Sequence, residues 1–211
     1  DARLPQAFAH PPNTPASMAM RVGVILLVAV AVTVGALSPK DQELFSAVQK
    51  DSAEAIKAAL EQGADLNAIG PGGQTPIMHA TLSGKEKAVA FLLTQSPDMT
   101  IGEKDGYTPM HGACFQGRAA IAEMLLAHGV NAREVHQDGY EPIFRACWGR
   151  EARHTETVRV LLDAGVPPDV ASEGRVRLLD ATKNSATREL IKSRLKKAKA
   201  AEKEAKAGGE L

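Results

Sequence analysis

A histidine and a cysteine stand three residues apart in the stretch DGYTPMHGACF, at His111 and Cys114. On one turn of a helix, this spacing places an imidazole beside a thiol. Such a pair can act as a base and a nucleophile, or supply two ligands to a metal ion. Catalysis would also need a third group that orients the base, such as a carboxylate. The rest of the chain decides between these uses and a structural one.

The stretch around this pair repeats at an interval of 33 residues. The sequences GGQTPIMHA, DGYTPMHGA and DGYEPIFRA begin at positions 72, 105 and 138, and a pair of leucines follows each copy. The last leucine pair is delayed by three extra residues within 149–157. Repetition at a fixed period predicts a stack of similar units.

The repeat favours the structural interpretation of the pair. Cys147 takes the place of Cys114 in the next copy, and no carboxylate recurs at a matching position. Free cysteine packs well as a small buried hydrophobe, and stacked units about 10 Å apart are too distant for a disulfide. The six histidines do not recur with acidic partners, and no Lys-Ser/Thr follows the glycine-rich turn at 70–73. We therefore expect no catalytic residue, no metal and no cofactor.

Each copy predicts a tight turn followed by two helices. An Asp-Gly pair provides the positive φ of a hairpin turn. Thr-Pro then begins a helix, because threonine can cap it and proline suits its first turn. Gly84, Gly117 and Gly149 mark the end of this helix, and apolar residues at helical spacing predict a second one. One unit cannot bury its apolar face alone, so the units must stack as a solenoid.

The combination of hairpin turn, T-P-x-H-x-A motif and two antiparallel helices resembles ankyrin repeats. The copy DGYTPMHGA matches the motif fully, whereas Met78, Glu141 and Phe144 depart from it in the other two. Upstream, residues 41–69 resemble a first unit. Downstream, residues 173–195 resemble a degenerate last unit that lacks Thr-Pro.

This resemblance covers about residues 40–196 and implies an all-α repeat solenoid with β-hairpin loops. It also implies that His111 is a structural residue, bonded to backbone between adjacent hairpins. For function, it implies protein binding through a concave surface formed by the hairpin tips and first helices.

Composition agrees with one layered domain. Hydrophobic residues make up 44% of the chain and aromatic residues only 4%, so the core must consist mainly of alanine, leucine and valine. We divide the chain into an extended or disordered segment (1–20), a hydrophobic segment (21–38), the solenoid (39–183) and a terminal capping helix with a basic tail (184–211).

The hydrophobic segment 21–38 has the character of a membrane anchor or a signal-peptide core. No charge lies between Arg21 and Lys40, and the apolar run is intermediate in length between the two. Since the chain begins at Asp1 and still contains the segment, we expect a retained transmembrane helix; the alternative is cleavage after Ala36. The flanking charges predict an extracytoplasmic or lumenal solenoid, for example in the thylakoid.

The C-terminal segment RELIKSRLKKAKAAEKEAKAGGEL predicts a charged helix. From residue 192 onward it carries seven lysines and arginines against three glutamates. We expect Ile191 and Leu195 to pack on the solenoid and the remainder to be a solvated cap. A sharper hypothesis is contact with an anionic lipid or protein surface. Nucleic acid is disfavoured, because no aromatic residue here can stack on a base.

Two groups of residues are candidates for binding a protein partner. The first lies on the expected concave face and comprises Glu103, Lys104, Tyr107, His136, Gln137 and Tyr140. The second is a basic loop with the single tryptophan, at the insertion in the fourth unit: Arg145, Trp148, Arg150, Arg153 and His154. Exposed tyrosines are good interface anchors. The alternative is that each tyrosine ring packs on the neighbouring hairpin.

These features predict a non-catalytic protein–protein interaction module tethered to a membrane. Small residues in the hydrophobic segment would let a membrane helix approach others closely. This favours an accessory subunit of a large organellar complex, photosynthetic or respiratory. The alternative is a soluble secreted or lumenal ankyrin adaptor that remains after cleavage of a signal peptide.

Overall fold

A computed structural model of the chain describes residues 37–208. This part contains helices and turns, with one isolated β-bridge between Ala171 and Arg177 and no strand. The predicted all-α solenoid is confirmed. Nearly all of the expected anchor at 21–38 lies outside the described residues. None of the helices between residues 37 and 208 combines the length and the apolar character that crossing a bilayer requires.

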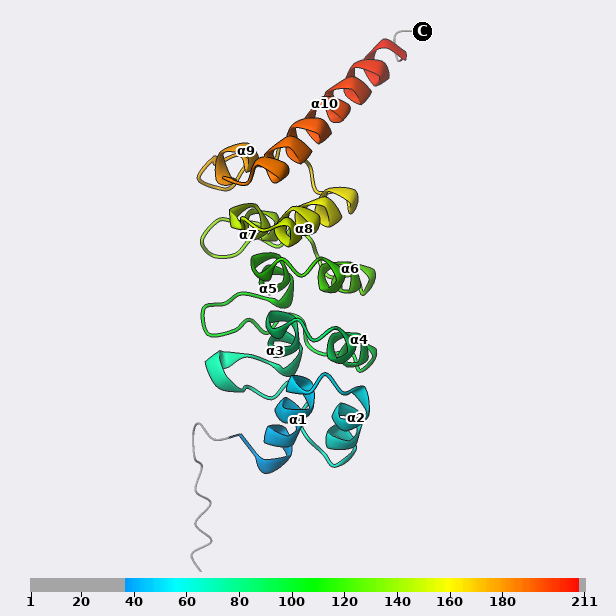
Figure 1. The fold of residues 1–211 in the computed structure, drawn as a ribbon, viewed down its shortest axis with the longest axis vertical. Coiled ribbons are helices and arrows are strands. Elements are labelled where there is room, and N and C mark those ends of the chain that lie inside the picture. The colour runs from blue at the N-terminus through cyan, green and yellow to red at the C-terminus, as the bar shows by residue number, and fades with distance from the viewer. Residues whose placement is uncertain (1–36, 209–211) are drawn as a thin grey trace, which may run out of the picture. The chain divides into compact units, whose positions relative to one another are not determined.

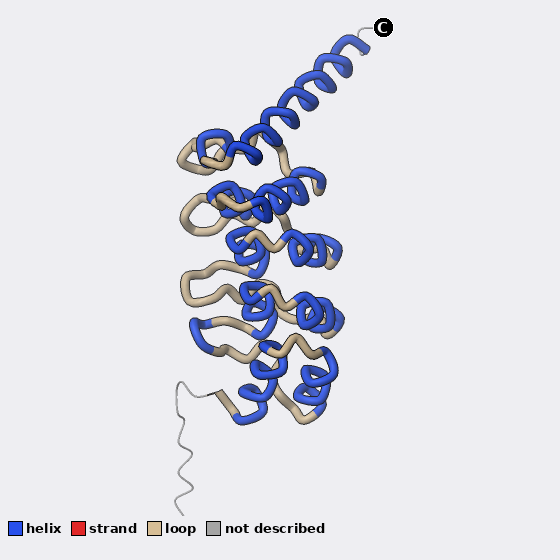
Figure 2. The backbone as a smooth tube through the Cα atoms, viewed as in Figure 1, coloured by secondary structure: helices blue, strands red, loops and turns tan. Residues whose placement is uncertain are grey.

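The helices form two rows in alternating order along the chain (Figures 1 and 2). The first row consists of α1 (Pro39–Gln49), α3 (Pro76–Ser83), α5 (Pro109–Gln116), α7 (Pro142–Trp148) and α9 (Leu178–Ala181). The second row consists of α2 (Ala53–Glu61), α4 (Glu86–Thr94), α6 (Ala119–Ala127), α8 (Ala152–Asp163) and α10 (Ser185–Gly208). Each helix packs on its row neighbours, and each first-row helix on the second-row helix that follows it.

Small residues at equivalent positions let the first-row helices lie close together. Ala80, Ala113 and Ala146 are completely buried at the centres of α3, α5 and α7. Cys114 and Cys147 follow two of them and are also fully buried, as free thiols. This confirms that the cysteines pack in the core.

A tight turn precedes each of the helices α3, α5, α7 and α9. These four hairpins span residues 70–74, 103–107, 136–140 and 172–176. In each, the first residue donates its backbone N–H to the carbonyl oxygen of the last, over 2.9–3.1 Å. Gly106 and Gly139 adopt φ values of 86° and 81°, as the Asp-Gly turns predict. Within residues 37–208 the hairpins remain turns and add no strand pairing beyond the single bridge.

The hydrogen bond that joins the second and third hairpins differs from those that join the first to the second and the third to the fourth. The first pair is joined by Lys104 N–H to the carbonyl of Gly72 at 3.1 Å, and the last pair in the same way. Between the middle two, Nε2 of His136 bonds the carbonyl oxygen of Asp105 at 2.9 Å. The resemblance assigned such a role to His111. Its ring interacts with the backbone of Tyr140 in the next hairpin, but Nε2 makes no hydrogen bond of normal distance and angle.

The insertion in the fourth unit is helical, which corrects the expectation of a loop. Helix α8 has 12 residues, whereas α4 and α6 have nine each. The extra turn brings His154 into the interior, where its Nε2 lies 3.2 Å from the carbonyl oxygen of Phe115. Gly149 accordingly ends α7 in an extended conformation, unlike the left-handed Gly84 and Gly117.

Helix α10 begins as part of the stack and continues beyond it (Figure 1). The side chain of Asn184 accepts hydrogen bonds from the backbone N–H groups of two residues in the first turn of α10, at 3.0 and 3.3 Å. Ile191 is fully buried and Leu195 packs against the core. From residue 196 to residue 205 the side chains are exposed, so this part of α10 is open to solvent.

Candidate protein-binding face

One surface of the stack exposes large apolar side chains at regular intervals. Leu82, Phe115 and Trp148 are spaced 33 residues apart, near the C-terminal ends of α3, α5 and α7. Phe115 is 58% exposed and Trp148 is 40% exposed, and Leu82 is half-buried. We call the surface made by the hairpins and the first-row helices the hairpin face. Its aligned apolar side chains are typical of a surface that another protein covers.

Beside this row, an aromatic cluster connects the third and fourth units. Tyr107 stacks on the imidazole of His136, with ring centroids 3.9 Å apart. The guanidinium carbon of Arg145 lies 4.6 Å from the ring centroid of Tyr107 and 4.5 Å from that of Trp148. These are cation–π distances, so the charge of Arg145 holds aromatic side chains from two units together.

Asp138 completes the cluster by pairing with Arg145. Its other carboxylate oxygen lies 3.0 Å from Nδ1 of His136, and Tyr107 donates its hydroxyl to Asp138 at 3.2 Å. Partial burial opposes ionisation of Asp138, but the hydrogen bonds from Arg145 and His136 outweigh it and lower the pKa to about 2. Burial raises the pKa of Tyr107 above its ordinary value. Asp138 is therefore a carboxylate, and Tyr107 a neutral phenol, near neutral pH.

His111 and Cys114 are both buried, in surroundings that oppose the charged form of each. The hydroxyl of Thr108 donates to Glu134 at 2.9 Å, so it accepts from Nδ1 of His111, 3.0 Å away. Burial lowers the pKa of His111, which keeps the imidazole neutral. Burial, with the neighbouring Cys147, raises the pKa of the Cys114 thiol far above its ordinary value. A buried, protonated thiol is a poor nucleophile.

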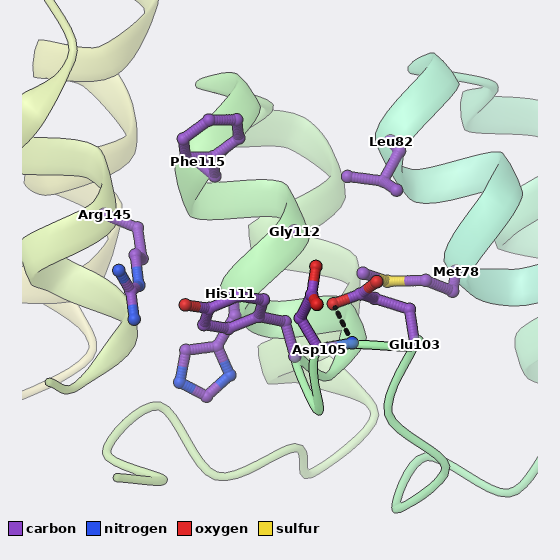
Figure 3. A pocket seen from close by; sticks show the side chains of 9 residues that line it. Met78, Leu82, Glu103, Asp105, His111, Gly112, Phe115 and Arg145 are labelled. Carbon is purple, nitrogen blue, oxygen red and sulfur yellow. Dashed lines mark hydrogen bonds between the residues drawn. The ribbon is translucent and has the colours of Figure 1, made fainter. Parts of the chain in front are cut away.

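A pocket of about 280 Å³ opens on the hairpin face over Gly112 (Figure 3). It is lined by Met78, Leu82, Glu103, Asp105, Tyr107, His111, Gly112, Phe115 and Arg145. The lining combines side chains from α3, α5 and α7 with those of the hairpin 103–107. Among residues 37–208, no group of three histidine, cysteine or acidic side chains is arranged to hold a metal ion.

The structure places the predicted partner-binding residues in two environments. Exposed or half-buried are Glu103, Lys104, Tyr107, Gln137, Tyr140, Trp148, Arg150 and Arg153. Buried, at 6–8% exposure, are His136, Arg145 and His154. These three hold neighbouring side chains and hairpins in place, so a partner would touch mainly the first group.

The two tyrosines differ in what they touch. Tyr107 packs on the next hairpin through His136 and Asp138. Tyr140 packs instead on Phe144 and Trp148 of the helix that follows it, at centroid distances of 5.3 and 5.2 Å. The Tyr107 ring therefore packs on the neighbouring hairpin, as the alternative expected, whereas the Tyr140 ring packs within its own unit. Both also remain partly accessible on the hairpin face.

Sequence reasoning missed Leu82 and Phe115 as surface residues. A signal was present, because both stand in register with Trp148 in the repeat. Neither was among the residues predicted to bind a partner, and only the structure shows that Phe115 faces solvent.

Comparison with known families agrees with the stacked helical pairs. A family model for ankyrin repeats, containing three copies, matches residues 44–134 and, in a second overlapping match, residues 95–172. These matches together cover more than half of the chain. The chain belongs to the ankyrin-repeat family. Its repeats make it a protein–protein interaction module. A search of curated proteins finds no match.

Proposed function

We propose that this ankyrin-repeat protein is a non-catalytic binding subunit that holds a partner protein on its hairpin face. The observation that carries the proposal is the exposed row of Leu82, Phe115 and Trp148. Solvent-exposed aromatic side chains in a line are unfavourable unless something covers them, and aromatic residues supply much of the binding energy at interfaces.

We further propose that the chain is tethered to a membrane by residues 21–38, with the solenoid on the lumenal or extracytoplasmic side. This proposal rests on the sequence alone, namely the uncharged apolar run between Arg21 and Lys40. An accessory role in a large organellar membrane complex, photosynthetic or respiratory, would use both the tether and the hairpin face. A secreted or lumenal soluble adaptor remains the alternative.

Helix α10 supplies a second candidate contact. Lys192, Lys196, Lys199 and Lys203 recur at intervals of four, three and four residues, so they lie along one side of the helix. All four are exposed. A line of lysines favours an anionic surface, either lipid headgroups or an acidic face of a partner protein.

Purification of the native protein in mild detergent tests the proposal. Mass spectrometry of the intact chain and of its companions would report both the N-terminus and the partner. We expect residues 21–38 to be present and a defined set of membrane proteins to accompany the chain at a fixed ratio. A chain that begins near Leu37 and elutes alone would contradict both the tether and the subunit role.

A further inference from the structure

The pocket over Gly112 lies where the third unit has a glycine and its neighbours in the repeat have larger side chains. His79, Gly112 and Arg145 occupy the same position in three successive units. His79 contacts Gln74 and Gln49 at 3.1 Å each. Arg145 fills the equivalent place in the fourth unit with its own side chain. Gly112 has no side chain, and Met78 and Leu82 of α3 lie within 3.1–3.2 Å of where its Cβ would stand. The pocket opens beside these side chains.

The surroundings of Arg145 indicate what that pocket would hold. In the fourth unit the guanidinium pairs with Asp138 and lies over the ring of Trp148. One repeat earlier, the residues in register with Asp138 and Trp148 are Asp105 and Phe115. Both line the pocket. The third unit therefore has counterparts of the carboxylate and the aromatic ring that contact Arg145 in the fourth unit, but it has a glycine in place of the arginine.

The remaining lining suits a cation on an apolar stem. In Figure 3, Glu103 and Asp105 lie at the hairpin end of the pocket, and Leu82 and Phe115 at the opposite end. Glu103 is fixed by the backbone N–H of Asp105, which donates to its carboxylate at 3.0 Å. A carboxylate oxygen can accept more than one hydrogen bond, so Glu103 retains capacity for a ligand.

The charge balance at the pocket is negative. Arg145 also lines it, but its charge is balanced by Asp138. Lys104 lies 4.0 Å from Asp105, with both side chains more than 60% exposed, so this contact is weak and easily exchanged. The volume of about 280 Å³ is at the lower limit of small-molecule sites, roughly 300–1,000 Å³, and suits a single side chain.

We propose that the pocket over Gly112 binds the side chain of an arginine presented by the partner protein. The guanidinium would lie between Asp105 and Phe115, and its aliphatic stem would lie against the apolar lining made by Leu82 and Met78. This inference rests on the proposed function, because it assigns one anchor of the partner on the hairpin face. Arginine is favoured over lysine, because its planar cation stacks on rings and bonds carboxylates at the same time.

Methyl NMR of the full chain in detergent micelles tests the arginine site. Met78 lines the pocket, and its methyl carbon lies 3.1 Å from where a Cβ on Gly112 would stand. With methionine methyl groups labelled, we expect a saturable shift of the Met78 signal on addition of the blocked tripeptide Gly-Arg-Gly. Met124 on α6 should not move. The matching citrulline and leucine tripeptides should bind at least tenfold more weakly.

A charge-removing variant provides the second arm. Glu103→Gln combined with Asp105→Asn keeps the side-chain volumes and should weaken binding of the arginine tripeptide at least fivefold. The control variant Glu123→Gln, on the exposed side of α6, should leave this affinity unchanged. The inference would be overturned if the Met78 signal did not shift with the arginine tripeptide, or if it shifted equally with the citrulline tripeptide. Either result would leave the proposed function standing, because capture of a partner by the hairpin face is measured separately.

Discussion

The guanidinium of Arg145 on α7 lies over the ring of Tyr107 in the preceding hairpin, with 4.6 Å between the guanidinium carbon and the ring centroid. This contact joins the third and fourth units at the place where their hairpins share no direct backbone bond. Elsewhere a backbone N–H crosses between hairpins. Here the side chains of Arg145, His136 and Asp138 make the connection.

Arg145→Met should therefore destabilise the solenoid while keeping the apolar stem in place. The variant loses the cation–π contacts with Tyr107 and Trp148 and the ion pair with Asp138, so we expect the free energy of unfolding to fall by about 1–3 kcal/mol. Urea unfolding followed by circular dichroism measures the difference. Arg150→Met, at an exposed position of the same unit, should change stability by less than about 0.5 kcal/mol. Equal effects of the two variants would contradict the role given to Arg145.

Asp138 should make the protein sensitive to acid. Its folded pKa of about 2 lies below the ordinary value of 3.8, so its contribution is present above pH 4 and is lost as the pH falls toward 2. Because a third of the side chain is exposed, we expect roughly 1 kcal/mol from this group after solvent screening. Carboxyl NMR should show its pKa rising toward the ordinary value in Arg145→Met. An unchanged pKa would mean that Arg145 is not its main partner.

Gly149 and His154 should be coupled. A Cβ at Gly149 would stand 2.0 Å from the imidazole ring of His154, closer than any two carbons can pack. We expect Gly149→Ala to cost about 1–3 kcal/mol of stability through overpacking. The double variant with His154→Ala should recover part of this loss, which a double-mutant cycle would show.

Gly174→Ala is the control for that cycle. Its Cβ would meet nothing closer than 3.7 Å, and we expect a change within about 0.5 kcal/mol. Additive effects of Gly149→Ala and His154→Ala would show that the imidazole of His154 does not fill the space beside Gly149.

The lysines of α10 should favour anionic lipid. A variant with Lys196, Lys199 and Lys203 changed to glutamine removes three charges, each worth about 1 kcal/mol near such a surface. Because the proposed tether would bind any bilayer, the quantity to compare is the ratio of partitioning into phosphatidylserine-containing and purely zwitterionic vesicles. We expect the variant to lower this ratio at least tenfold at low salt. A ratio that does not change would reject the lipid contact.

The sequence predicted the features that are local and repeated. Asp-Gly turns, Thr-Pro helix starts and buried alanines each depend on a few neighbouring residues, and three copies in register make the pattern reliable. Even among these features, the threonine cap at the start of the first helix differs between units. The hydroxyl of Thr75 accepts a 3.3 Å hydrogen bond from the backbone N–H of Met78 and so caps α3. The hydroxyl of Thr108 bonds instead to the side chains of His111 and Glu134.

Contacts between units could not be read from the pattern. Arg145 stands in a basic stretch and was expected to face a partner, yet it is buried because Asp138 and two rings surround it. The pocket over Gly112 depends on what three separate helices leave unfilled, which one repeat in isolation does not show. The insertion in unit four gave no sign of whether it would lengthen a loop or a helix.

The most direct test of partner binding on the hairpin face is site-specific photo-crosslinking in the native cell. A photoreactive phenylalanine analogue would replace Phe115 on this face or, in a second variant, Glu123 on the exposed side of α6. We predict that position 115 captures one protein, the same one that accompanies the purified chain, and that position 123 captures none. Capture from position 123 alone, or of many unrelated proteins from position 115, would contradict the account.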